Sequence, residues 1–357
     1  LVGAKPSGLA NPNVKWEESR QTNLGLDLGF WGNKLTFTTD VYDKKTSGIL
    51  MAMPVPTYAG DSAPTGNVGD MSNYGVEFEL TYRDQIGDLL WHVSANATYV
   101  RNKLTYLGDE STYLTGSSHK IGTLTRGIVG MPFPYFFGWK TDGIFQNPEE
   151  VKNYVNAEGG LIQPNAVPGD VRFVDLDGNG RIDDDDRTMI GKGIPDWTFG
   201  LNLGFEWKGI DFNMLLQGQA GNDVFNVTRR TDLYYINLPK TILNRWTGEG
   251  STNRYPRFSF ESANENTRVS DLWVEDGSYL RARNVQLGYT LPAELTRKIA
   301  INRLRFYVQA ENLFTLTRYT GCDPEVHGGN GFSTEAGIDR GVYPQSRTFS
   351  VGVNVNF

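Results

Sequence analysis

Residues 197–207 read WTFGLNLGFEW and alternate large apolar residues with small or polar ones. Successive side chains of a β-strand point to opposite faces, so a period of two predicts a strand, whereas a helix would give a period near 3.6. The polar face would carry Thr198, Asn202 and Glu206, with glycine between them. The apolar face would carry Trp197, Phe199, Leu201, Leu203, Phe205 and Trp207. The stretch therefore predicts a strand with one apolar and one polar face.

Eight further stretches show the same alternation. One is the end of the chain, where Phe349 and Phe357 bound an apolar row over residues 348–357. In another stretch, Arg281 and Arg283 stand at positions that the alternation assigns to the apolar face. This predicts either a bulge or a strand that leaves a membrane there. The other predicted strands cover residues 24–30, 35–41, 74–82, 91–99, 210–216, 285–289 and 304–310. The sequence thus predicts an all-β fold with nine long strands.

The length of these strands favours a transmembrane antiparallel β-barrel. Strands of soluble proteins have about 5–6 residues, whereas these run to roughly 10 or 11, which suits a tilted strand that crosses a bilayer. Aromatic pairs such as Trp197 and Trp207, or Tyr74 and Tyr82, bound the apolar rows, as in the interfacial girdles of such barrels. The sequence has no apolar run of about 18 residues, so a transmembrane helix is not predicted. A soluble β-protein is the alternative.

Short and long links alternate between the predicted strands. Outer-membrane barrels have short periplasmic turns and long extracellular loops, so the long links are predicted to be extracellular. The short links are Gly32–Asn33, 84–88, 208–209 and 292–302. The long links are 44–72, 102–195, 221–278 and 318–346.

The odd number of strands predicts that the chain is part of a larger barrel. A bacterial single-chain barrel normally has an even number of strands, and an open edge in lipid would leave backbone groups unpaired. The sequence also starts without a signal peptide, as if in the middle of a loop. We therefore expect residues 1–357 to be the C-terminal part of a barrel, with early strands and any plug upstream or on another chain.

Composition and motifs narrow the function. The net charge of −7 argues against a nucleic-acid partner, which would require clustered Lys and Arg. The single cysteine, Cys322, excludes an internal disulfide and a cysteine zinc cluster. The sequence has no nucleophile elbow, P-loop or dinucleotide fingerprint. We therefore do not expect an enzyme.

An acidic segment inside the longest link, DLDGNGRIDDDD at residues 175–186, matches the twelve-residue calcium loop. Calcium prefers six to eight hard oxygen ligands, and glycine at the sixth position allows the chain to turn around the ion. The twelfth position holds Asp instead of Glu, and the flanks do not predict a helix pair. The candidate ligands are Asp175, Asp177, Asn179, Arg181 through its backbone carbonyl, Asp183 and Asp186. We predict a structural Ca²⁺ site, with a solvated surface turn as the alternative.

Aromatic residues are frequent in the long links. They would either pack the links into folded caps or contact a ligand or partner protein. They are Tyr135, Phe136, Phe137, Trp139, Tyr234, Tyr235, Trp246, Tyr255, Phe258 and Phe260.

Several stretches resemble the C-terminal barrel of SusC/RagA-type TonB-linked outer-membrane transporters of the Bacteroidetes. They span nearly the whole chain. They include NPNVKWEESRQTNLGLDLGF, NYGVEFELTY, EDGSYLRARNVQLGYTLP, LRFYVQAENLFTLTRYTGCDPE and GVYPQSRTFSVGVNVNF. The acidic segment, followed by PDWTFGLNLGFEW, falls where this family carries an Asp/Asn/Gly-rich segment before the PDW strand.

The resemblance implies a barrel of about 22 strands with an N-terminal plug. It also implies TonB-energised import across the outer membrane of a Gram-negative cell, a SusD-like surface lipoprotein as partner, and a glycan or oligopeptide as cargo. The plug, the region that contacts TonB and the early strands are outside this sequence. The alternatives are a passive porin-like channel and a surface β-rich glycan-binding module.

Overall fold

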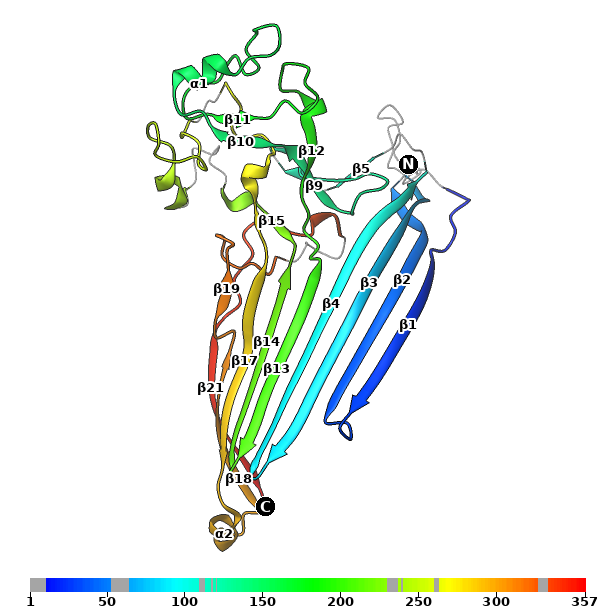
Figure 1. Cartoon of the computed structure of the whole chain (residues 1–357), viewed down its shortest axis with the longest axis vertical. Helices are drawn as coiled ribbons and strands as arrows, with labels where there is room; N and C mark the ends of the chain where they lie inside the picture. The colour runs from blue at the N-terminus through cyan, green and yellow to red at the C-terminus, as the bar shows by residue number, and fades with distance from the viewer. Residues whose placement is uncertain are drawn as a thin grey trace, which may run out of the picture.

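Nine long antiparallel strands form one continuous curved wall (Figure 1). The computed structural model describes residues 11–52, 64–108, 113–116, 118–119, 121–229, 237–238, 240–259, 263–326 and 333–357. The wall strands, in spatial order, are β1 (Glu18–Phe30), β2 (Leu35–Ala52), β3 (Thr65–Ile86), β4 (Leu89–Leu107), β13 (Trp197–Trp207), β14 (Ile210–Ala220), β17 (Tyr279–Thr290), β18 (Arg303–Glu311) and β21 (Thr348–Asn356). A short tenth strand, β19 (Thr315–Thr317), pairs with the upper part of β17. The structure confirms the nine predicted strands.

The predicted faces are also confirmed. Every wall strand pairs antiparallel with its neighbours in a register that keeps the apolar rows on one side, as in Phe199↔Ala97 and Phe306↔Val353. Large apolar side chains along these rows are exposed, among them Leu24, Phe78, Val308 and Val351. An exposed apolar surface of this extent indicates contact with an apolar environment.

Three of the wall strands extend into regions that the sequence predicts to be long links. β2, β3 and β4 have 18, 22 and 19 residues. β2 and β3 stay paired up to Ala52↔Thr65, so the link predicted over 44–72 is shorter and spans residues 53–64. In the same way β4 continues to Leu107, so the link predicted over 102–195 starts at 108. The upper segments carry glycines, and register shifts follow Thr46 and Ile49, so no continuous apolar row marks them in the sequence.

The interruption in β17 is a bulge. The register shifts at Leu215 and Leu216 of β14, which face Asn284 and Ala282, so Arg283 is the extra residue. Above the bulge β17 stays paired with β14, while β19 replaces β18 on its other edge. There the backbone N–H of Ala282 donates to the carbonyl of Phe314, and the N–H of Leu313 donates to the carbonyl of Ala282. An extra residue changes which face of the sheet the side chains beyond it occupy. This explains why Arg281 and Arg283 stand at positions that the alternation assigns to the apolar face.

The short links lie at one end of the wall and the long links at the other (Figure 1). Lys208 and Gly209 turn tightly between β13 and β14, both with positive φ. Helix α2 (Ala293–Thr296) lies at the same end, near the C-terminus (Figure 1). None of the helices in the described ranges is long and apolar enough to cross a membrane.

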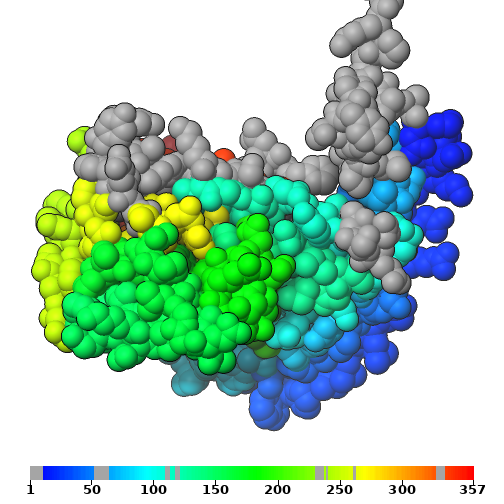
Figure 2. Space-filling model, turned by 90° about the horizontal axis from the view of Figure 1, so that it is seen from above, coloured from blue at the N-terminus to red at the C-terminus, as the bar shows by residue number. Residues whose placement is uncertain are grey.

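The described parts of the links after β4, β14 and β19 fold into a cap above the wall (Figures 1 and 2). Its four-stranded sheet has the order β12-β9-β8-β5, with smaller sheets beside it. The cap elements are β5 (Leu114–Thr115), β6 (Ser118–His119), β7 (Gly122–Thr123), β8 (Thr125–Gly127), β9 (Tyr135–Trp139), β10 (Thr141–Ile144), α1 (Pro148–Asn153), β11 (Val171–Phe173), β12 (Arg187–Gly191), β15 (Asp223–Asn226), β16 (Val274–Asp276) and β20 (Ile338–Asp339).

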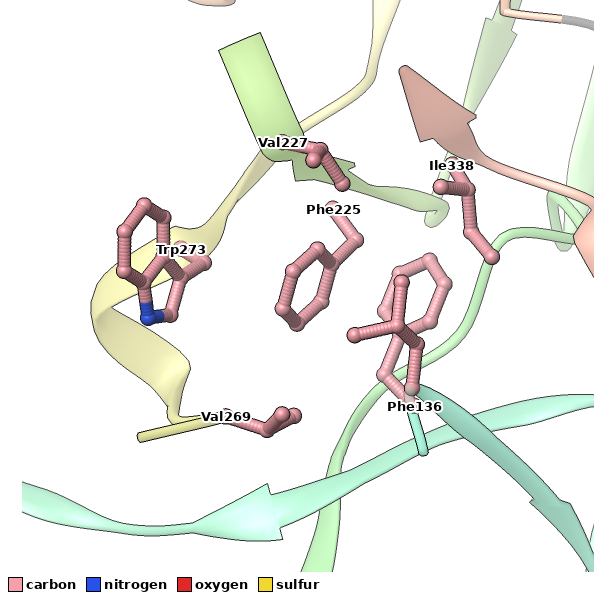
Figure 3. Packing of buried hydrophobic residues seen from close by; sticks show 7 residues of the cluster. Phe136, Phe225, Val227, Val269, Trp273 and Ile338 are labelled. Carbon is pink, nitrogen blue, oxygen red and sulfur yellow. The ribbon is translucent and has the colours of Figure 1, made fainter. Parts of the chain in front are cut away.

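The cap has its own hydrophobic core, drawn in Figure 3, which joins three links that are far apart in the sequence. Phe136 of β9 meets Phe225 of β15, with ring centroids 5.6 Å apart. The core consists of Leu124, Phe136, Phe225, Val227, Val269, Trp273 and Ile338. Because these residues come from the links after β4, β14 and β19, the three links form one folded unit.

Candidate functional site

The acidic loop lies in the cap, between β11 and β12. Asp175 closes its first turn: its two carboxylate oxygens accept from the backbone N–H groups of Gly178 and Gly180, each at 2.8 Å. Gly178 and Gly180 both have positive φ, +75° and +83°, a conformation that residues with a side chain rarely adopt. The glycines therefore allow the chain to fold back around the first carboxylate.

Asp186, at the other end of the loop, is fully buried. One oxygen accepts from the N–H of Leu176 at 2.7 Å, and the other accepts from the N–H of Asp183 at 2.8 Å. Asp183 in turn caps the short 3₁₀ turn over 184–186 and accepts from the N–H of Asp185. This hydrogen bond lowers the pKa of the Asp183 carboxyl.

The structure brings most of the predicted ligands together. Oxygens of Asp175, Asp177 and Asp186 lie within 4.8 Å of one another, as do those of Asp177, Asp183 and Asp185. Asp185 was not among the predicted ligands, because it falls between the ninth and twelfth positions of the motif. Three carboxylates at this spacing supply the hard oxygen ligands that suit Ca²⁺.

Two predicted ligands make other contacts. Asn179 accepts from the N–H of Arg181 through its side-chain oxygen, and its amide nitrogen donates to Asp177 and Asp183. The guanidinium of Arg181 pairs with Asp183 at 2.7 Å. The calcium-loop motif uses only the backbone carbonyl of Arg181 as a ligand, so it does not predict this ion pair of the side chain.

Trp139 connects the acidic loop to the four-stranded sheet, since its indole N–H donates to the carbonyl of Asp183 at 2.7 Å. Tyr135, Phe136 and Phe137 of the same strand are buried, which supports the packing interpretation of these aromatics. Tyr234, Tyr235 and Phe260 lie outside the described residues.

A buried ion-pair network at the β17 bulge fastens the last long link to the wall. Arg281 contacts Asp323 at 2.5 Å and Glu325 at 2.8 Å, and Arg283 also pairs with Glu325. Asp323 accepts from the backbone N–H of Gln345 as well. Although burial opposes the shift, the backbone N–H groups of Gln345 and Glu325, together with the guanidinium of Arg281, lower the pKa of the Asp323 carboxyl. The sequence signal for this network is the pair of arginines at positions that the alternation assigns to the apolar face. The sequence does not show their acidic partners, which lie 42 and 44 residues after Arg281.

The polar face of the wall carries a second charged group near the short-link end. Arg305 of β18 pairs with Asp211 of β14 at 2.5 Å and donates to Gln286 of β17 at 3.0 Å. These residues line a hollow of about 970 Å³ together with Glu206 and Asn354. Of the polar row of β18, Arg303 and Arg305 line this hollow.

A comparison with protein families decides the identity of the wall. A family model described as "TonB dependent receptor-like, beta-barrel" matches residues 3–313. The chain belongs to this family. The TonB-dependent receptor β-barrel therefore explains both the two-faced strands and the long links at one end.

Curated relatives of this TonB-dependent receptor β-barrel agree with the family. TonB-dependent receptor P3 of Formosa agariphila is 32% identical over 364 residues, covering 99% of this chain and 36% of the relative. TonB-dependent receptor SusC of Bacteroides thetaiotaomicron is 29% identical, covering 97% of this chain and 32% of SusC. The chain thus spans about a third of the length of the relatives it matches.

Among solved structures, the chain resembles the RagAB peptide transporter, with a TM-score of 0.77 and 28% sequence identity. The match covers 97% of this chain and 36% of the RagAB chain. The "closed-closed" state of the RagAB peptide importer gives a TM-score of 0.76 at 27% identity. The predicted resemblance to SusC and RagA is confirmed.

Proposed function

We propose that the chain is part of an active importer in the outer membrane of a Gram-negative cell. The wall would separate lipid on its apolar face from a lumen on its polar face. The observation that carries the proposal is the nine-stranded wall of a TonB-dependent receptor barrel, with three of its long links joined in a cap at one end. In this proposal the cap end is extracellular and the short turns are periplasmic.

The barrel would be completed by strands outside this sequence. Among the described strands, β1 pairs only with β2 and β21 pairs only with β18, so each has an edge available. Such edges are not tolerated in lipid, and further strands would close the barrel at about 22, around a plug. Energy would come from TonB through the region outside this sequence.

The partner would be a SusD-like surface lipoprotein seated on the cap, and the cargo a bulky glycan or oligopeptide. The support is similarity: SusC is a TonB-dependent receptor and RagAB is described as a peptide transporter. A cap with its own core would give such a partner a fixed surface.

Purification from outer membranes in mild detergent, followed by mass spectrometry, tests the assembly. We expect a surface lipoprotein and peptides of an upstream barrel-and-plug region to co-migrate with this chain. Recovery of the chain alone, soluble without detergent, would contradict the proposal and favour the surface glycan-binding module.

Planar bilayer recordings separate the importer from the passive porin. A plugged importer is expected to be silent or nearly so. Steady ion conductance from the purified complex would instead support the porin.

We also propose that Ca²⁺ binds the acidic loop and locks it onto the cap. Asp175, Asp177 and Asp186 would hold the ion, since they combine hard ligands with a glycine turn. With millimolar calcium, we expect slower proteolysis of the intact protein near residue 175, and Asp177→Asn should abolish this protection. Asp142→Asn, an exposed carboxylate elsewhere in the cap, is the matched control. Equal cutting with calcium and with chelator would refute the site.

A further inference from the structure

One face of the four-stranded cap sheet carries two arginines stacked on aromatic rings. The opposite face, with Phe136, packs into the cap core. On the first face Arg126 of β8 lies opposite Tyr135, and Arg187 of β12 lies opposite Trp139. The strands therefore place both guanidinium groups over the same aromatic surface.

Phe137 is the centre of this arrangement. The guanidinium carbon of Arg126 lies 3.6 Å from the centroid of the Phe137 ring and 4.0 Å from that of Tyr113. The guanidinium carbon of Arg187 lies 4.5 Å from Phe137 and 4.8 Å from Trp139. Stacking on ring faces leaves the edges of a guanidinium, which carry its N–H donors, directed away from the rings.

Among the residues that the structure describes, carboxylates compensate little of the positive charge of these two arginines. Within the described part of the chain, Arg126 has no carboxylate partner, and its buried Nε has no hydrogen-bond partner. Arg187 donates to the carbonyl of Thr123 and has one distant carboxylate, Asp184, at 3.7 Å on an exposed side chain. Its own Nε is also buried without a partner. Burial, with repulsion from Arg126 also contributing, lowers the pKa of Arg187. An oxyanion would relieve this uncompensated charge.

The surroundings favour a hydroxyl-rich ligand. Tyr113 is half exposed, so its ring offers a surface to the C–H face of a sugar. A hollow of about 590 Å³ borders Trp139 and Asp184, which both contact Arg187. Glu265 and Arg268 also line it. Glu265 pairs with Arg268 at 2.6 Å, whereas the exposed carboxylate of Asp184 can accept hydrogen bonds from hydroxyl groups. The mixture of bases, acids and rings therefore matches a saccharide with hydroxyls and single charged groups.

We propose that the Arg126–Arg187 face is an oxyanion-binding site for a saccharide that carries carboxylate or sulfate groups. Each guanidinium would hold one oxyanion through its terminal Nη–H donors, because the Nε of both arginines is buried, while the hollow at Trp139 holds hydroxyls. The proposal rests on the proposed import function, because it gives the chemical class of the cargo. It can nevertheless be tested by binding alone, without transport.

The experiment measures binding of defined probes to the intact detergent-solubilised complex by isothermal titration. The probes are an oligogalacturonate, a sulfated galactose oligomer, the neutral galactose oligomer of equal length and a glutamate-rich peptide. We expect at least one charged saccharide to bind about tenfold or more tightly than the neutral oligomer, the gain expected from one charge-assisted hydrogen-bond pair.

The variants are Arg126→Met and Arg187→Met, which keep an unbranched apolar side chain over the rings and remove the charge. Each is expected to abolish the preference for the charged saccharide while leaving the melting curve unchanged. The matched control is Arg172→Met, because Arg172 also lies near a ring, at 5.9 Å from Phe145, but has Asp142 as its partner. Arg126→Lys, which keeps the charge without the planar fork, should retain part of the preference.

Three results would overturn the proposal: equal affinity for charged and neutral oligomers, charged-saccharide binding unaffected in both Met variants, or Arg126-dependent binding of the peptide alone. Since none of these readouts uses TonB or uptake, a failure here leaves the import function untouched. Conversely, a complex that conducts ions passively could still bind the charged oligomer at this face.

Discussion

At the scale of single residues, Arg281 shows how one side chain connects the wall to a link. It is almost fully buried, and its guanidinium reaches two carboxylates of the last link. Removal of one partner from a buried ion pair leaves an uncompensated charge and costs about 3–5 kcal/mol. The network therefore holds the link after β19 at a fixed position.

Asp323→Asn is expected to release this link locally. The measurement is hydrogen–deuterium exchange around Gln345, whose backbone N–H donates to Asp323. Exchange should rise in the variant, and Asp142→Asn, which breaks an exposed pair, should leave it unchanged. Unchanged exchange in Asp323→Asn would show that the ion pairs do not position the link.

The same network predicts a pH dependence. In the folded protein the pKa of Asp323 is lowered, so its contribution is present above the ordinary value of 3.8 and is lost as the pH falls through the lower folded value. Exchange at Gln345, corrected for intrinsic rates, should therefore rise below about pH 4 in the wild type. In Asp323→Asn this acid-dependent component should be absent.

At the scale of elements, β18 and β21 show how the polar face of the wall is packed. Tyr307 lies directly opposite Gly352, and a Cβ on this glycine would come within 2.3 Å of the tyrosine ring. The glycine is therefore required by the close approach of the ring. The strand pattern shows that Gly352 faces the polar side, but it does not show which side chain covers it.

Gly352→Val is expected to displace Tyr307 and destabilise the β18–β21 pair by about 1–3 kcal/mol, as overpacking does. The midpoint of thermal unfolding in detergent should fall. Ser350→Val, on the same face of the same strand, is the control, since it tests a larger side chain outside the Tyr307 contact. Equal midpoints for Gly352→Val and wild type would show that the ring moves without cost.

At the scale of the whole molecule, the wall and the cap have separate sources of stability. The wall is held by continuous backbone pairing from β1 to β21. The cap is held by a core to which three links contribute (Figure 3). Loss of the cap core should therefore loosen the links without opening the wall.

Phe225→Ala is expected to cost the cap about 3–5 kcal/mol, because Phe225 is fully buried against Phe136. Limited proteolysis should then cut the links after β4 and β14 faster, while the wall strands stay protected. Leu243→Ala, at an exposed leucine, is the control. Simultaneous loss of wall and cap would show that the two are one cooperative unit.

The sequence by itself determined the nine wall strands, their faces and the acidic loop. In each case the information is local: a period of two over about ten residues, or carboxylates and glycines within one twelve-residue stretch. Only the tertiary structure decided the upper halves of β2 and β3, the partners of Arg281, and the assembly of Leu124, Phe225 and Ile338 into one core. These features depend on contacts between residues far apart in the chain, and local periodicity carries no record of such pairings.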